Sequence, residues 1–138
     1  METPSVRVYL AGRVSVEGPA SVLPSDQFPG QQGRVAFAFL ALERARPVTH
    51  AELAEVLWPE ALPPAWESAL SAIVSKLRSV VAKSGLAGAV SMTSSRGAYE
   101  LSLPADAWVD VEAAADAIHE AEAALRAEIG RASCRERV

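Results

Sequence analysis

The spacing of apolar residues changes near Arg34, and this change restricts the fold class more than any other feature. Between Val6 and Val16, apolar residues alternate with polar or small ones, which is the period of half-buried strands. Ala20–Leu23 is a further short strand, and the Pro-, Gly- and Gln-rich stretch 24–33 is predicted as a loop. From Arg34 onward the apolar residues cluster as in helices. Strands followed by helices predict an α+β fold.

Three helices are predicted next, each with recognisable ends. The first runs from Arg34 and stops before Pro47, because the residue before a proline is disfavoured in a helix. The second opens at a capping box, Thr49 to Glu52, and ends at Pro59. The third covers about 64–83, opened by a proline pair and closed by Ser84-Gly85.

A hairpin and a last helix follow. Residues 90–103 read as two strands around a turn at 93–97, 106–110 as a link, and 111–129 as a Glu/Ala-rich helix. An N-terminal sheet, three helices and a C-terminal hairpin, followed by one more helix, form the layout of a winged helix.

The third helix has two contrasting faces. At about 100° per residue, its large apolar side chains cluster on one side, and serines at 68, 71, 75 and 79 occupy the other. Lys76 and Arg78 flank this serine strip on opposite sides. Small hydrogen-bonding groups at the crest and cations toward the phosphates suit a helix lying in the major groove of DNA. The alternative is an ordinary solvated face.

The hairpin supplies one more candidate contact, Arg96. A cation beside Gly97 on a projecting turn suits a phosphate or a minor groove. The alternative is a surface arginine next to a turn glycine.

Charge is distributed unevenly along the chain. The formal net charge is −4, yet residues 1–104 hold nine Lys/Arg and nine Asp/Glu, so the acidic excess lies after residue 104. A neutral domain binds DNA only if its cations share one face. We therefore expect modest affinity from a monomer.

Several segments together resemble the N-terminal domain of SARP/BTAD-class bacterial transcriptional activators, an OmpR/PhoB-type winged helix. The resemblance covers about residues 5–126, and its specificity comes from the order and spacing of segments that are individually weak. The matching segments are Phe28–Arg34, Arg46–Thr49, Glu52–Leu53, Leu57–Pro59, Ala69–Ser71, Ser75–Arg78, Arg96–Tyr99 and Ala107–Asp110.

The resemblance implies a function and a set of contacts. It implies an N-terminal antiparallel sheet packed on three helices. The third helix would enter the major groove of promoter DNA and the hairpin would lie on the adjacent backbone. The implied DNA-binding residues are Ser68, Ser71, Ser75, Lys76, Arg78 and Arg96. The family also implies head-to-tail dimers on direct repeats and an RNA polymerase contact through loop 59–64. Related recognition helices carry more arginine than this one, which puts affinity and base preference in question.

The resemblance also divides the chain into parts. Residues 5–104 would form the winged helix, and 105–129 a linker and the first helix of a truncated helical-repeat domain. Residues 130–138 change character abruptly and resemble vector-derived sequence. A single Cys134, no secretion signal and no long apolar run predict a cytoplasmic protein without disulfides or membrane spans.

Catalytic and metal-binding patterns are missing from the sequence. It contains no Walker A loop, GxGxxG, HExxH or GxSxG motif, and its two histidines, His50 and His119, read as surface residues. We therefore expect no enzyme activity, cofactor or metal. The competing hypothesis is a winged helix used for protein contact, with the acidic C-terminal helix as a docking surface. A small enzyme is a distant third, which a pocket with perturbed titratable groups would revive.

Overall fold

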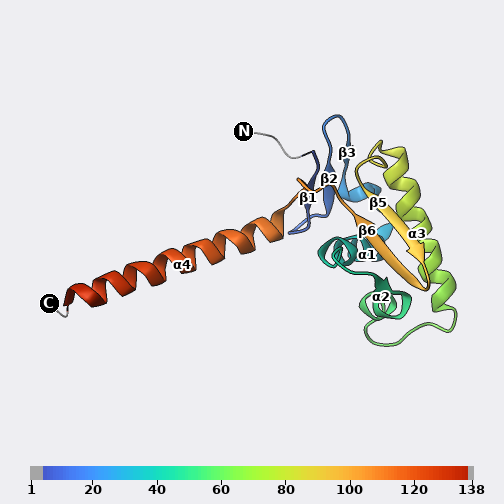
Figure 1. The fold of residues 1–138 in the computed structure, drawn as a ribbon. Coiled ribbons are helices and arrows are strands. Elements are labelled where there is room, and N and C mark those ends of the chain that lie inside the picture. Colours follow the sequence, from blue (N-terminus) through green and yellow to red (C-terminus); the bar gives the residue numbers. More distant parts are fainter. Residues whose placement is uncertain (1–4, 137–138) are drawn as a thin grey trace.

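The computed structural model describes residues 5–136, with side chains described as far as Arg131. Two small sheets and three helices form one body, from which a fourth helix projects (Figure 1). The elements are β1 (Arg7–Tyr9), β2 (Ser15–Glu17), β3 (Val22–Leu23), a 3-10 turn (Ser25–Gln27), α1 (Gly30–Leu42), β4 (Val48–Thr49), α2 (His50–Leu57), α3 (Trp66–Lys83), β5 (Ser91–Ser95), β6 (Ala98–Ser102), β7 (Trp108–Val109) and α4 (Asp110–Glu136).

The N-terminal sheet has the order β3-β2-β1-β7. Its first three strands are antiparallel, as predicted, whereas β7 joins β1 in parallel with Val8 opposite Val109. The Tyr9 and Trp108 rings meet edge to face at 5.4 Å on this pair. The sequence did not indicate β7, because two apolar residues within the predicted link 106–110 are too few to show a period.

Helix α1 begins at Gly30, so the predicted loop 24–33 is wrong in its second half. Gly33 is already helical, and its N–H donates to the Pro29 carbonyl at 3.1 Å. A Cβ at Gly33 would lie 2.5 Å from Pro29 Cγ. Gly33 therefore allows the Pro29 ring to lie close to the helix backbone, and it does not form a turn. The glycine content of this segment alone wrongly suggested a loop.

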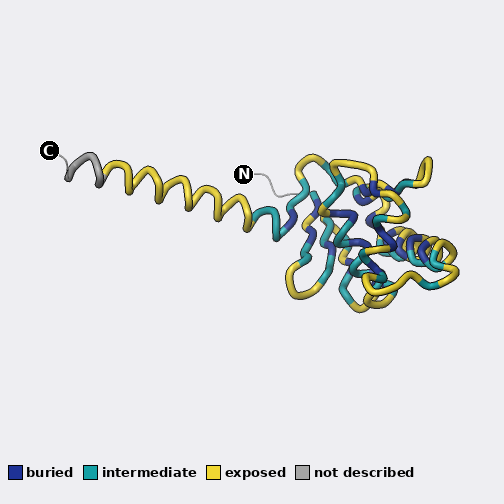
Figure 2. The backbone as a smooth tube through the Cα atoms, turned by 90° about the horizontal axis from the view of Figure 1, so that it is seen from below, coloured by how far each residue is buried: buried dark blue, intermediate teal, exposed yellow. Residues whose placement is uncertain are grey.

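The core lies between α1, α2, α3 and the inner faces of both sheets. Phe37 of α1 is fully buried at its centre, and Phe28 meets it edge to face at 5.3 Å. Leu53 of α2 and Leu77 of α3 are equally buried. Figure 2 shows these buried segments confined to the body, while α4 is exposed beyond its first turn.

The second sheet has the order β4-β6-β5, and its β5–β6 hairpin is the predicted one with a tighter turn. Ser95 pairs with Ala98, so the turn is Arg96-Gly97 alone and the predicted turn 93–97 is too long. Both turn residues have positive φ, 51° and 74°. This is the geometry of a type I′ hairpin turn, whose twist matches that of the strands.

Helix α2 starts at the predicted capping box. Thr49 Oγ1 accepts from the Glu52 N–H at 3.1 Å, and the Glu52 carboxylate accepts from the Thr49 N–H at 3.2 Å. Arg46 adds an ion pair with Glu52 at 2.8 Å. The hydrogen bond from Arg46, and then that from the Thr49 N–H, lowers the pKa of Glu52 from 4.5 to about 2.

This lowered pKa predicts a pH dependence of stability. Because Glu52 binds its proton less readily in the folded state, its contribution is complete above pH 4.5 and is lost as the pH falls toward about 2. A Glu52→Gln variant should be less stable than the parent above pH 4.5 and should approach it across that window. Urea unfolding of both proteins between these pH values measures the difference; a constant difference would contradict the assignment.

Helix α4 is attached to the body at its first residues and runs further than predicted. The Asp110 carboxylate accepts from the backbone N–H groups of Leu10 at 2.9 Å and Ala11 at 3.1 Å. Arg44 of α1 pairs with Glu112 at 2.7 Å. The helix continues past residue 129 to Glu136, since alanine, glutamate and arginine favour helix and one glycine costs only about 1 kcal/mol. No helix in the described part of the chain is long and apolar enough to cross a membrane.

Candidate nucleic-acid interface

Helix α3 is packed on the body along one face and open to solvent along the other. Leu70, Val74, Leu77 and Val81 are buried. The predicted contact residues Ser68, Ser71 and Ser75 are all exposed, and helical geometry places them within about 60° of one another. We call the exposed row formed by Ser68, Ser71, Ser75 and Ser79 the serine crest.

Two kinds of flank border the serine crest. On one side, Lys76 is followed seven residues later by Lys83, and both side chains are exposed. Seven residues are close to two helical turns, so the two ammonium groups extend from the same side of α3. The sequence reasoning missed Lys83, although this spacing from Lys76 was visible.

Arg78 extends from the other flank of the serine crest, toward the hairpin. It lines a shallow pocket of about 180 Å³ together with Val90, Ser91 and Met92 of the chain entering and forming β5. Burial raises the pKa of the Tyr99 hydroxyl on β6, and the positive charge of Arg78 partly opposes this rise. Arg78 therefore lies between the serine crest and the hairpin.

Arg96 occupies the tip of the hairpin, and its side chain is exposed. The tip is held in place by α2, because the His50 N–H donates to the Gly97 carbonyl at 3.0 Å. The His50 ring also stacks on Tyr99, with ring centroids 4.3 Å apart. Arg96 is thus presented from a fixed turn, at the cost of a left-handed backbone conformation.

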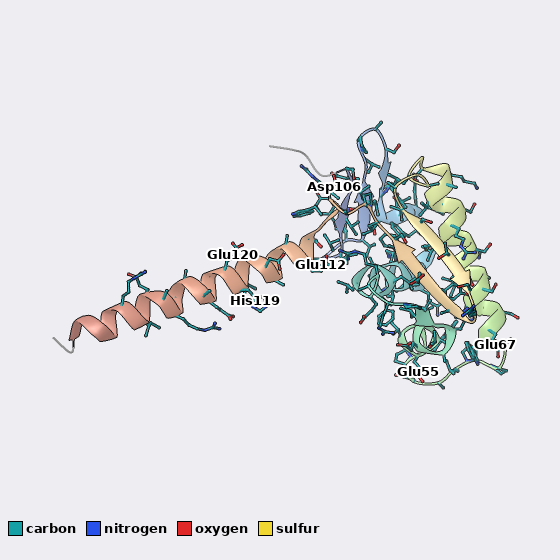
Figure 3. All side chains as sticks on the ribbon, viewed as in Figure 1. Glu55, Glu67, Asp106, Glu112, His119 and Glu120 are labelled. Atoms are coloured by element: carbon teal, nitrogen blue, oxygen red, sulfur yellow. The ribbon has the colours of Figure 1, made fainter. Side chains whose placement is uncertain are left out.

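The cations around α3 and the hairpin are not used in ion pairs within the described residues. The ion pairs among the described residues all involve arginines elsewhere in the chain, at positions 44, 46, 126 and 131. Residues 66–102 carry four Lys/Arg and two Asp/Glu, so this segment is basic, although residues 1–104 as a whole are neutral. Glu67 is one of the two acids; it lies in the first turn of α3, at the lower right in Figure 3.

The loop before α3 is largely open. Residues 59–62 are exposed, including Leu62 at 41%, and the Trp66 N–H donates to the Pro63 carbonyl at 3.1 Å. The helix begins at Trp66, two residues after the predicted proline start, and its N-cap, Ala65, has no side-chain hydrogen bond. The amides of the first turn therefore have no side-chain cap.

Comparisons with known proteins identify the fold. No protein-family model matches the chain, and no curated protein matches its sequence. The structure is similar to that of EmbR from Mycobacterium tuberculosis, solved in complex with a low affinity phosphopeptide, with a TM-score of 0.60 and 22% identity. The match covers 76% of this chain and 27% of the EmbR chain, so this chain spans about a quarter of that protein. The likeness confirms the predicted α+β winged-helix fold.

Proposed function

We propose that the chain is the sequence-specific DNA-binding domain of a bacterial transcription regulator of the SARP type. Helix α3, with the turn that precedes it (about 64–83), would enter the major groove, and the hairpin (about 90–103) would lie on the adjacent backbone. One observation carries the proposal: the exposed serine crest is bordered by cations that no described carboxylate neutralises, next to a hairpin that ends in Arg96.

The chemistry of this surface suits duplex DNA. Serine hydroxyls donate and accept hydrogen bonds, so Ser68, Ser71 and Ser75 suit base edges, while Lys76 and Arg78 suit the phosphates on either side. With few cations in a neutral body, one domain binds weakly. Two copies on direct repeats would add their contacts, and the exposed loop 59–64 would then be free to meet RNA polymerase.

Selection from a random duplex library tests the proposal directly. The full chain should enrich one repeated motif, and its affinity for that DNA should fall as salt rises, because bound cations release counterions from the phosphates. Failure to enrich any motif, with the protein folded and at high concentration, would remove sequence-specific DNA binding as the function.

Lys76 and Lys83 give a prediction about the slope of that salt dependence. Each Lys→Ala variant should weaken binding to all sequences alike, and the slope of log K against log salt should fall by about one per lysine. Arg126→Ala, which removes a cation from α4, is the matched control and should keep the parental slope. If the slope is unchanged in both lysine variants, Lys76 and Lys83 do not contact the DNA phosphates.

Arg96→Asn should separate stability from binding. Asparagine tolerates the left-handed φ of 51°, so the variant should gain up to about 1 kcal/mol in stability while DNA affinity falls several-fold. Arg96→Lys retains the charge and should bind nearly as well as the parent. Thermal unfolding and titration of the same samples measure both quantities; if Arg96→Asn binds as tightly as the parent, the hairpin tip does not contact DNA.

A protein-contact role is the second candidate. It is favoured by the balanced charge of residues 1–104 and by the phosphopeptide in the similar EmbR structure. In this case an acidic or phosphorylated peptide, rather than DNA, would bind the basic segment. Titrations with a phosphopeptide and with random and selected DNA duplexes distinguish the two roles. Binding of the phosphopeptide without binding of any duplex would favour the protein-contact role.

A further inference from the structure

The histidine at the start of α2 is the one side chain among the described residues that leaves a buried polar atom unpaired. His50 is half-buried, so it is not the surface residue that the sequence suggested. Its ring nitrogen Nε2 is shielded from solvent, and no described residue forms a hydrogen bond with it. Such an atom destabilises a fold, because it loses its hydrogen bond to water and gains none in return. The contacts of the ring show what the histidine contributes instead.

The ring of His50 contacts the hairpin through its flat face. It stacks on Tyr99 of β6, with ring centroids 4.3 Å apart and an angle of 23° between the ring planes. Tyr99 is itself buried. The backbone N–H of the same histidine donates to the Gly97 carbonyl at 3.0 Å. His50 therefore meets the hairpin at two points, one on a strand and one in the turn.

Helix α2 gives this histidine a firm base, whereas the hairpin has few other attachments near its tip. The capping box fixes the first turn of α2, and Leu53 is fully buried in the core. Among the described residues, β6 joins β4 through two residue pairs only. Every residue of β5 is exposed or half-buried. The position of the tip therefore depends on its contacts with His50.

Two cations of the candidate interface lie around this stack. Arg96 is in the two-residue turn that begins and ends the hairpin tip, next to the Gly97 carbonyl that His50 binds. Arg78 of α3 is near enough to Tyr99 for its positive charge to act on the hydroxyl. Tyr99 is thus linked to Arg96 along the chain and to Arg78 across to α3. Whatever fixes Tyr99 also fixes the spacing between these two cations.

We propose that His50 is a positioning residue of the DNA-binding surface: its ring, stacked on Tyr99, holds the hairpin at a fixed place relative to α3. Arg96 then meets a phosphate from a backbone that is already ordered. A group that is ordered before binding loses less conformational entropy on binding, so the affinity is higher. The effect on DNA rests on the proposed function, whereas the hold on the hairpin is a property of the free protein.

The unpaired nitrogen provides a conservative variant. His50→Phe keeps a flat ring and has no nitrogen to leave unpaired, so it should hold the hairpin and unfold a few degrees above the parent. His50→Ala removes the ring and leaves the backbone hydrogen bond to Gly97 in place. Tyr9→Ala is the matched control, because it removes an aromatic contact, with Trp108 at 5.4 Å, from the N-terminal sheet.

Hydrogen exchange of backbone amides in the free protein tests the hold on the hairpin. In His50→Ala, the amides of β5 and β6 near the tip should exchange several-fold faster than in the parent, relative to the amides of α1. In His50→Phe and in Tyr9→Ala, the same ratio should stay at its parental value. An unchanged ratio in His50→Ala would overturn the proposal without any reference to DNA.

A double-mutant cycle tests the consequence for DNA. With Arg96 present, His50→Ala should weaken binding to the selected duplex several-fold, and His50→Phe should not. In an Arg96→Asn background, His50→Ala should weaken binding by less than about twofold, because no cation remains at the tip to be positioned. Equal weakening in both backgrounds would mean that His50 acts through overall stability, and would overturn the proposal. If the parent selects no duplex, the proposed function fails, while the exchange rates still show whether His50 holds the hairpin.

Discussion

Replacing Phe37 with alanine is expected to destabilise the domain by about 3–5 kcal/mol, a large share of the stability of a domain of this size. The ring is fully buried between the three helices of the body, and the edge of Phe28 lies against it. Removing it leaves a cavity that helices fixed by the sheets cannot close. The loss therefore combines the transfer free energy of the ring with the missing contacts.

Urea unfolding provides the measurement for Phe37→Ala. Leu42→Ala, on the same helix but 48% exposed, is the matched control and should cost less than about 1 kcal/mol. Similar losses in the two variants, or a loss below about 1 kcal/mol for Phe37→Ala, would show that α1 is not the centre of the core. Secondary structure should persist at low urea, so that binding can still be measured.

The parts of the fold that could be predicted are those coded by neighbouring residues. Pro59 limits α2 through local backbone sterics, and the capping box at Thr49 acts within four residues. Helix α1, by contrast, ends at Leu42, five residues before the Pro47 that was predicted to stop it. The hairpin followed from alternating residues around a turn that contains Gly97. Such signals do not depend on the rest of the chain.

The parts that could not be predicted depend on partners distant in sequence. Strands β4 and β7 have two residues each, and they are strands only because β6 and β1 lie beside them. The early start of α1 follows from Pro29 packing on Gly33, while the glycines and glutamines of that segment suggested a loop. Amino-acid composition indicates only the local preference for helix, strand or loop, and tertiary contacts can override that preference.

The candidate site shows the same division. The serine crest followed from helical period alone, since one face of α3 had to be buried. The direction of Arg78 toward the hairpin required the placement of β5 and the loop before it, and the left-handed backbone of Arg96 required the two-residue turn. Periodicity assigns residues to faces, whereas the fold decides what each face meets.

Placing two carboxylates on the serine crest is expected to weaken sequence-specific DNA binding roughly 100-fold. In Ser71→Glu/Ser75→Glu, both new charges would lie between the phosphate walls of the groove, and both would lose the donor groups that serine offers to base edges. A cost of about 1.4 kcal/mol per site amounts to roughly 100-fold in affinity. Both positions are exposed, so the free energy of unfolding should change by less than about 1 kcal/mol.

The control for this variant must carry the same charge away from α3. Ala123→Glu/Ala127→Glu on α4 does so, and it alters the net charge of the chain equally. The parent and both variants are titrated with the selected duplex at one salt concentration. This compares repulsion by carboxylates on α3 with repulsion by the net charge of the whole chain. If the α4 variant loses as much affinity as the α3 variant, the effect is one of net charge and α3 is not the reading helix. If only the α3 variant loses binding while remaining folded, the serine crest is the surface that meets the DNA.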